Sequence, residues 1–231
     1  MYDENYQEST PIVSKTNVGF SLVFVWMFFG ILVTAGFAFL CTLFPQALLV
    51  SYSMPGMIIS GIVQIVIALS LGKAALVKLN KGLAATLFFV YSAINGITFG
   101  LLFYVLNASE LFAIFGITAG FFGIMALCSV IFKEQLRRSS GFFMIGLVAL
   151  LIMSIVSSIL WYNNTLLLGV SIVGLLVFGG LTAFDMRWIK DAMDRSDNPS
   201  GVAIYGAFHL YLDFINIFMY IVRIFLLSNR D

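Results

Sequence analysis

The chain has 231 residues, of which 61% are hydrophobic and only 10% are charged. A water-soluble domain cannot bury this much apolar surface. The formal net charge of +1 leaves no basic or acidic excess, so nucleic acid is not expected as a partner. Composition therefore predicts an all-α integral membrane protein, with the lipid bilayer as its surroundings.

Apolar runs long enough to cross a bilayer follow one another along the chain. A hydrocarbon core of roughly 30 Å requires about 20 mostly apolar residues per helix. We expect a cytoplasmic tail at 1–18, one membrane domain of seven helices at 19–227, and a short tail at 228–231. The predicted spans cover residues 19–44, 50–72, 83–106, 110–132, 141–161, 165–185 and 202–227.

Basic residues occur in every second connection, which predicts the orientation of the protein. Lys and Arg are retained on the cytoplasmic side of a membrane, so the N-terminus should be cytoplasmic and the C-terminus outside. The first residues lack a basic leader and the connections are short, which fits the plasma (inner) membrane of a bacterium. The basic residues in question are Lys15, Lys73, Lys78, Lys81, Lys133, Arg137, Arg138, Arg187, Lys190 and Arg195.

Two pentapeptides carry glycines four residues apart, at Gly96 and Gly100 and again at Gly116 and Gly120. Small residues at this spacing allow the backbones of neighbouring membrane helices to approach closely. We expect all four glycines to lie at helix contacts.

The last span carries polar residues at steps of four, four, three, four and three, which is the spacing of one helix face. Ionisable groups in a membrane normally face the protein interior or a water-filled cavity. The stripe should therefore point inward and make this span a central helix. It consists of Tyr205, His209, Asp213, Asn216, Tyr220 and Arg223.

Two carboxylates are the residues most suited to chemistry. Asp213 lies about eleven residues into the last span, roughly 16 Å deep, and Asp185 is predicted at the end of the span before it. Two carboxylates in a low-dielectric site cannot both ionise easily, so they should titrate together and sense protons. Once deprotonated, their oxygens suit Ca²⁺, with Asp213 as a transient ligand. No cofactor or permanent metal site is expected.

A plainer interpretation is that Asp213, His209 and Asn216 form a hydrogen-bond network that holds the bundle together. His209 alone is better read as an interior hydrogen-bonding residue than as a metal ligand. A smaller stripe in the third span, formed by Tyr91, Asn95 and Thr98, suggests further interhelical hydrogen bonds.

Three segments carry a family resemblance: LFFVYSAINGITFG in the third span, GLTAFDMRWIK ending the sixth, and HLYLDFINIFMYIVRIF in the seventh. Together they resemble the Bax inhibitor motif family. The resemblance implies seven helices, six of them around a central C-terminal one, and a pH-sensitive calcium leak. Members of that family also include cell-death regulators and bacterial proteins that associate with a membrane protease.

The resemblance also implies roles for individual residues. Asp185 and Asp213 match the two aspartates that sense protons in the family. An arginine of the second helix usually latches that region, and here Lys78 is the nearest candidate, with Lys73 behind it. Lysine is a point donor and not a bidentate fork, so such a latch should be weaker. Gln64 replaces a carboxylate often found in the second span.

We therefore expect a proton-regulated leak of cations, with Ca²⁺ as the expected ion. A membrane regulator of a partner protein such as a protease, without transport of its own, is one alternative, and a proton-coupled transporter is another. An intramembrane aspartyl protease is disfavoured, because Leu210, Tyr211 and Leu212 replace the glycines that open the helix before the second aspartate in such enzymes.

Overall fold

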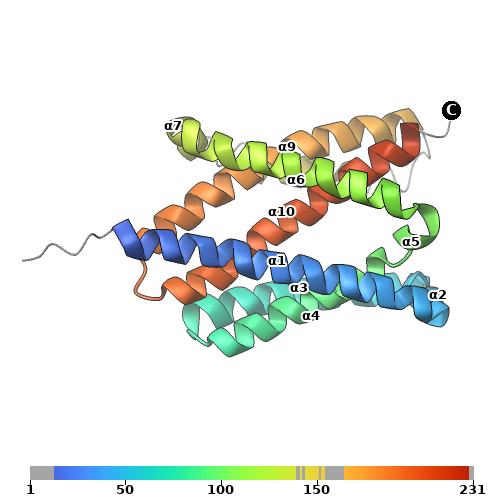
Figure 1. The fold of residues 1–231 in the computed structure, drawn as a ribbon, viewed down its shortest axis with the longest axis horizontal. Coiled ribbons are helices and arrows are strands. Elements are labelled where there is room, and N and C mark those ends of the chain that lie inside the picture. Colours follow the sequence, from blue (N-terminus) through green and yellow to red (C-terminus); the bar gives the residue numbers. More distant parts are fainter. Residues whose placement is uncertain (1–12, 139–140, 142–143, 151, 154–163, 229–231) are drawn as a thin grey trace, which may run out of the picture.

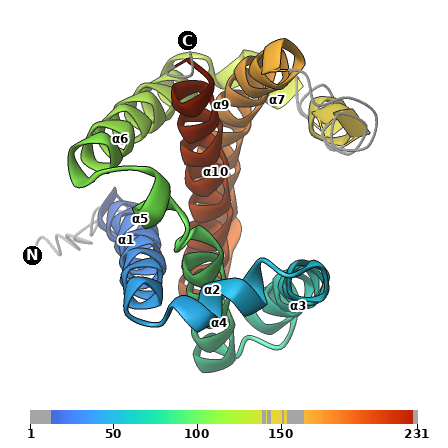
Figure 2. The same ribbon diagram turned by 90° about the vertical axis from the view of Figure 1, so that its right-hand side faces the viewer.

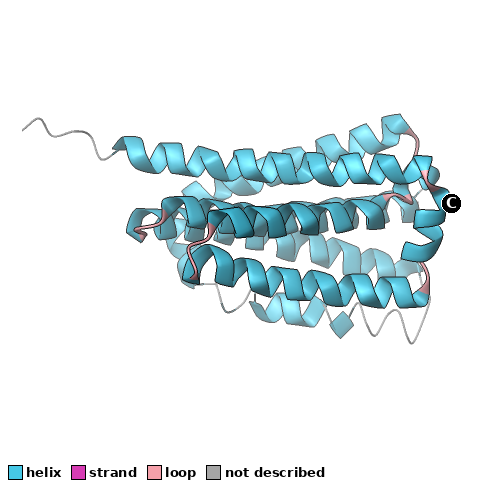
Figure 3. Cartoon of the chain, turned by 90° about the horizontal axis from the view of Figure 1, so that it is seen from below, coloured by secondary structure: helices cyan, strands magenta, loops and turns pink. Residues whose placement is uncertain are grey.

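The protein is a bundle of long helices with short connections, seen in a computed structural model that describes residues 13–138, 141, 144–150, 152–153 and 164–228 (Figure 3). Within these residues, six helices are long and apolar enough to cross a membrane. The prediction of an all-helical, multi-pass membrane protein is confirmed. The six spans are Gly19–Leu43, Met54–Val77, Lys81–Val105, Ala108–Ile131, Asn164–Arg195 and Pro199–Ser228.

The predicted fifth span, at 141–161, falls largely outside the described residues. Within it, residues 144–150 are helical.

The first half of the chain forms helices whose ends follow from capping. The helix α1 (Val13–Leu43) begins within the predicted tail, and α2 (Pro45–Ser51) starts with a proline, whose fixed φ suits the first helical turn. Ser53 then caps α3 (Met54–Gly72) by accepting a 3.1 Å hydrogen bond from the Gly56 amide. This span continues for one more turn as a π-helix, η1 (Lys73–Val77).

The third predicted span is not one continuous helix. The helix α4 (Lys81–Phe99), capped by Asn80, ends before Gly100, and the chain resumes as α5 (Leu102–Val105). Glycine has the lowest helix propensity apart from proline, so a break at this position is expected. A capping box of Asn107 and Glu110 then starts α6 (Ala108–Ile131), which α7 (Lys133–Arg138) follows.

The last two spans are longer than predicted. The helix α9 (Asn164–Arg195) extends ten residues beyond the predicted end at Asp185, and α10 (Pro199–Ser228) follows after three residues. Charged residues do not end α9 because they lie along its surface, where Arg187 Nε is 3.1 Å from Asp191 Oδ2 one turn later. Asp185 therefore lies inside a helix and not at its end, which corrects the sequence-based prediction.

The helix α10 occupies the centre of the described bundle. It crosses between α1, α3 and α4 on one side and α6 and α9 on the other (Figure 1), and the view along the bundle shows it surrounded (Figure 2). It packs against α1, α4, α6, α9 and η1. Side chains on opposite sides of α10 are buried, as Tyr211 and Asp213 show with exposures of 0% and 5%. A helix that is buried on nearly all sides has to be apolar around most of its circumference, as α10 is.

Only one of the two glycine pairs lies at a helix contact. A Cβ at Gly96 would lie 2.5 Å from the Thr34 carbonyl oxygen, and one at Gly100 would lie 2.7 Å from Cys41 Cβ, so both glycines allow α4 to approach α1. A Cβ at Gly116 or Gly120 would meet no atom of the described residues within 4 Å. The prediction is confirmed for the first pair and wrong for the second, because that side of α6 faces outward.

The glycine contacts predict a difference between two matched substitutions. Gly96→Ala should lower the free energy of unfolding by about 1–3 kcal/mol, because backbone and not a flexible side chain opposes the new methyl group. Gly116→Ala should leave stability unchanged or raise it by up to about 1 kcal/mol, since alanine favours the helix. Thermal unfolding of both variants in detergent measures this, and equal effects would contradict the close packing of α1 on α4.

Candidate functional site

The site begins with a contact between α9 and α10. Asp185 lies ten residues before Arg195, and His209 lies ten residues after Pro199, so each side chain is about 15 Å from the α9–α10 turn. Antiparallel neighbours joined by a short turn bring these positions to the same level. His209 Nδ1 is accordingly 3.1 Å from Asp185 Oδ2.

Aromatic rings hold the imidazole of His209 in place. The Tyr205 ring lies one turn earlier on α10, with its centroid 4.5 Å from that of His209, and Trp188 of α9 is 6.1 Å away. The side chain of His209 is 34% exposed and that of Asp185 is 15% exposed, so the contact is accessible from one side.

Asp213 lies one turn deeper on α10 and is only 5% exposed. Its Oδ2 atom is buried and has no hydrogen-bond partner among the residues that the structure describes. The α9 side chains that interact with it are Asp185 and Thr182. The Thr182 hydroxyl already donates to the Phe178 carbonyl oxygen at 2.8 Å, which leaves its oxygen free only to accept. A protonated Asp213 can donate to such an acceptor, whereas a carboxylate cannot.

The two carboxyl groups are neighbours, yet among the hydrogen bonds of the described residues none joins them. Asp185 instead bonds to His209. The arrangement is therefore a row of three titratable groups, His209, Asp185 and Asp213, in which Asp185 stands between the other two. The sequence placed His209 on the same face as Asp213 but could not show that its partner is Asp185.

The rest of the polar stripe is half-buried and not uniformly directed into the core. The Asn216 amide donates to the Leu212 carbonyl oxygen of its own helix at 2.7 Å. The guanidinium of Arg223 lies 5.7 Å from the centre of the Tyr220 ring. Asp213 is thus the one member of the stripe that is fully buried in the described bundle.

The structure does not bring the predicted latch to the aspartates. Lys78 follows η1 and is exposed, as is Lys73, and within the described residues neither forms an ion pair with Asp185 or Asp213. The described residues also contain no cluster of three or more His, Cys, Asp or Glu side chains that could hold a metal ion. At this site the described residues offer a cation two carboxylates, which do not complete a coordination shell.

A second polar cluster lies on the opposite face of α10. Asn95 of α4 donates to the Tyr211 hydroxyl at 3.2 Å, and that hydroxyl lies 2.7 Å from Thr34 Oγ1 on α1. Thr34 in turn donates toward the Ser92 carbonyl oxygen at 3.0 Å. All four residues are buried. Sequence reasoning singled out Asn95 and missed the others, although Tyr211 is two residues from Asp213 and so had to face the other way.

Comparison with known proteins identifies the family. The family model described as Inhibitor of apoptosis-promoting Bax1, or Bax1-I, matches residues 16–231. The chain belongs to the Bax1-I family. The match covers every span of the Bax1-I chain that the structure describes, which confirms the resemblance seen in the third, sixth and seventh predicted spans.

Bacterial proteins are similar to this Bax1-I chain along most of their length. The Inner membrane protein YbhL of Escherichia coli (strain K12) is 33% identical over 218 residues, which cover 90% of each chain. An uncharacterized protein of Borreliella burgdorferi is 32% identical over 234 residues, covering 97% of each chain. An uncharacterized protein of Deinococcus radiodurans is 31% identical, with 86% of each chain covered.

The buried tyrosine cluster predicts that one hydroxyl stabilises three helices. Tyr211→Phe should lower the free energy of unfolding by about 1–2 kcal/mol, because Asn95 and Thr34 lose their partner inside the bundle. Tyr104→Phe is the matched control, since the Tyr104 hydroxyl bonds to the Thr42 carbonyl oxygen at an exposed position. Unfolding titrations of both variants in mixed micelles measure the difference, and a Tyr211→Phe protein as stable as the control would contradict it.

Proposed function

We propose that this Bax1-I protein is a proton-regulated leak for cations, with Ca²⁺ as the expected ion. Protonation of Asp185 and Asp213 changes the position of α10 and thereby the permeability of the bundle. The observation that carries the proposal is the Asp213 carboxyl group, buried in the middle of the central helix with one oxygen lacking a partner.

The free energy of this site depends strongly on protons. A charge on Asp213 would stand unsolvated at the depth of the hydrocarbon core, beside the second carboxyl group of Asp185. A proton on Asp213 removes that charge. Loss of this proton favours a rearrangement that brings water, a cation or a hydrogen-bond donor to the Asp213 carboxylate. Because Asp213 is part of α10, the rearrangement moves α10.

His209 gives the site a partner for the ionised form of Asp185. When both are charged, the 3.1 Å contact is an ion pair that joins α9 to α10 at the accessible end of the row. The expected role of His209 is to support the aspartates and not to bind a metal.

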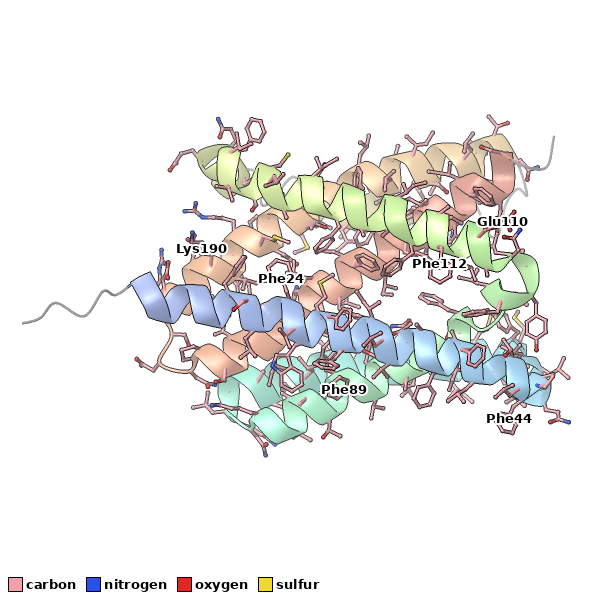
Figure 4. The ribbon with its side chains drawn as sticks, viewed as in Figure 1. Phe24, Phe44, Phe89, Glu110, Phe112 and Lys190 are labelled. Carbon is pink, nitrogen blue, oxygen red and sulfur yellow. The ribbon has the colours of Figure 1, made fainter. Side chains whose placement is uncertain are left out.

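The arrangement also supports seven spans with the N-terminus in the cytoplasm and the C-terminus outside. The helices α6 and α7 end on one side of the bundle, α9 begins on the other, and α10 ends opposite the start of α1 (Figure 1). The side chains of Lys190 and Glu110 mark opposite ends, with apolar side chains between them (Figure 4). The end that carries Lys190 also carries η1 and α7, in keeping with cytoplasmic retention of basic residues.

Calcium flux into proteoliposomes tests the proton-regulated leak. The flux of the wild-type protein should depend on pH, and Asp213→Asn, which fixes a neutral side chain of the same shape, should abolish that dependence. Asp185→Asn should weaken or abolish it as well, because the joint titration needs both groups.

Asp191→Asn is the matched control, because Asp191 forms a helix-surface ion pair with Arg187 away from the site. It should keep the wild-type pH profile. A profile unchanged in both site variants would overturn the sensor. Absence of flux in every sample, with a membrane protein retained in pull-downs, would support a non-transporting regulator instead.

The orientation predicts which engineered cysteines react from outside. With Cys41 and Cys128 replaced by alanine, Ser109→Cys should react with a membrane-impermeant maleimide in intact cells, because α6 begins at the outer end. Asp197→Cys, in the α9–α10 turn, should react only in inverted vesicles. The opposite pattern would reverse the proposed topology.

A further inference from the structure

An apolar cavity of about 430 Å³ lies between α1, α6 and α10, away from the aspartates. This volume is within the range of roughly 300–1,000 Å³ that is usual for sites that bind small molecules. Its walls are almost entirely hydrocarbon. Its lining includes Phe28, Ala35 and Ala38 of α1, Phe115 of α6, and Ile215 and Phe218 of α10.

The cavity is continuous with the surface that faces the lipid. Both α1 and α6 pack against α10, but they are not among the closely packed helix pairs of the described chain. Between them the rim consists of exposed apolar side chains, among them Phe28, Leu32 and Phe112. Figure 4 shows Phe112 beside α6 in the space toward α1. A lipid chain can therefore enter sideways from the bilayer.

The depth of the cavity matches one leaflet. Its wall on α1 runs from Phe28 to Ala38, ten residues or about 15 Å at 1.5 Å per residue. Half of a hydrocarbon core of roughly 30 Å has the same thickness. At one end the cavity reaches Ala108, next to the exposed polar cap of Asn107 and Glu110, where the membrane surface is expected. From there it runs toward the bilayer midplane, as an acyl chain does.

We propose that this cavity binds one acyl chain of a membrane phospholipid, with the headgroup at the α5–α6 end. The acyl chain contacts the face of α10 that carries Ile215 and Phe218. These residues lie four and seven positions after Tyr211, on the side of the helix opposite the Asp213 stripe. Bound lipid thus supports α10 from the side away from the proton site. The inference does not depend on what the protein transports.

Photo-crosslinking in liposomes tests the binding of an acyl chain. A phospholipid with a diazirine along one acyl chain, incorporated with the full-length protein, should label Ile215 and Phe218, because both side chains line the cavity. Peptide mass spectrometry locates the labelled residues. The wild-type protein alone is sufficient for this test. Absence of label from Ile215 and Phe218 would overturn the proposal.

Two matched tryptophan substitutions sharpen the test. Ala35→Trp should fill the cavity and remove the labelling of α10, whereas Ala113→Trp, on the exposed side of α6 and outside the cavity, should preserve it. Equal labelling of the two variants would overturn the assignment. Labelling by a diazirine fatty acid but not by the phospholipid would assign the cavity to a free acid, and a dimer dissociated by Ala35→Trp would assign it to a second copy of the chain.

Discussion

The burial of Asp213 is the constraint on which the rest of the structure depends. A carboxyl group in the middle of a membrane helix cannot face lipid, so the helix that carries it has to be enclosed by the others. The helix α10 satisfies this requirement at the centre of the bundle, where only 5% of Asp213 is exposed. The three residues between α9 and α10 then determine its neighbour, because so short a turn places α9 alongside and Asp185 next to the deeper carboxyl group.

The two faces of α10 have different polar chemistry. On one face, Tyr211 takes part in a buried chain of hydrogen bonds that runs from Asn95 to Thr34 and on to the backbone of α4. Every member of that chain has a partner, so the cluster rigidifies the packing of three helices. On the other face, Asp213 keeps an unpaired oxygen and Asp185 binds an accessible histidine. The two faces therefore differ in how completely the described residues pair their polar atoms.

The beginning of α10 is held by a separate contact. Asn198 Nδ2 donates to the Ala75 carbonyl oxygen of η1 at 3.3 Å. A Cβ at Gly201 would lie 2.5 Å from the same oxygen, so only glycine fits at this position. A π-helical turn is uncommon and often marks a functional position in a helix. Here it places Ala74 and Ala75 against Ile204, near the turn that leads into the central helix. These contacts hold the first turn of α10 against η1.

Much of the protein could be read from the chain itself, because the bilayer imposes simple rules. Apolar length predicted the spans, and the regular spacing of polar residues predicted a central last helix with Asp213 near its middle. Helix ends were less predictable: charged residues after Asp185 suggested an end to the span, but on the surface of α9 they pair with each other and the helix continues to Arg195.

Partnership between side chains was decided by tertiary structure alone. His209 could have bonded to any polar group at its depth, and the register of α9 against α10 selects Asp185. Gly96 and Gly116 occur in nearly the same pentapeptide, yet only Gly96 meets another helix. The cavity beside α10 exists because α1 and α6 both pack against α10 but not closely against each other, which no local pattern encodes. Sequence determines which residues can be buried in a membrane, whereas the relative placement of helices determines which atoms meet, because that placement depends on all the helix contacts at once.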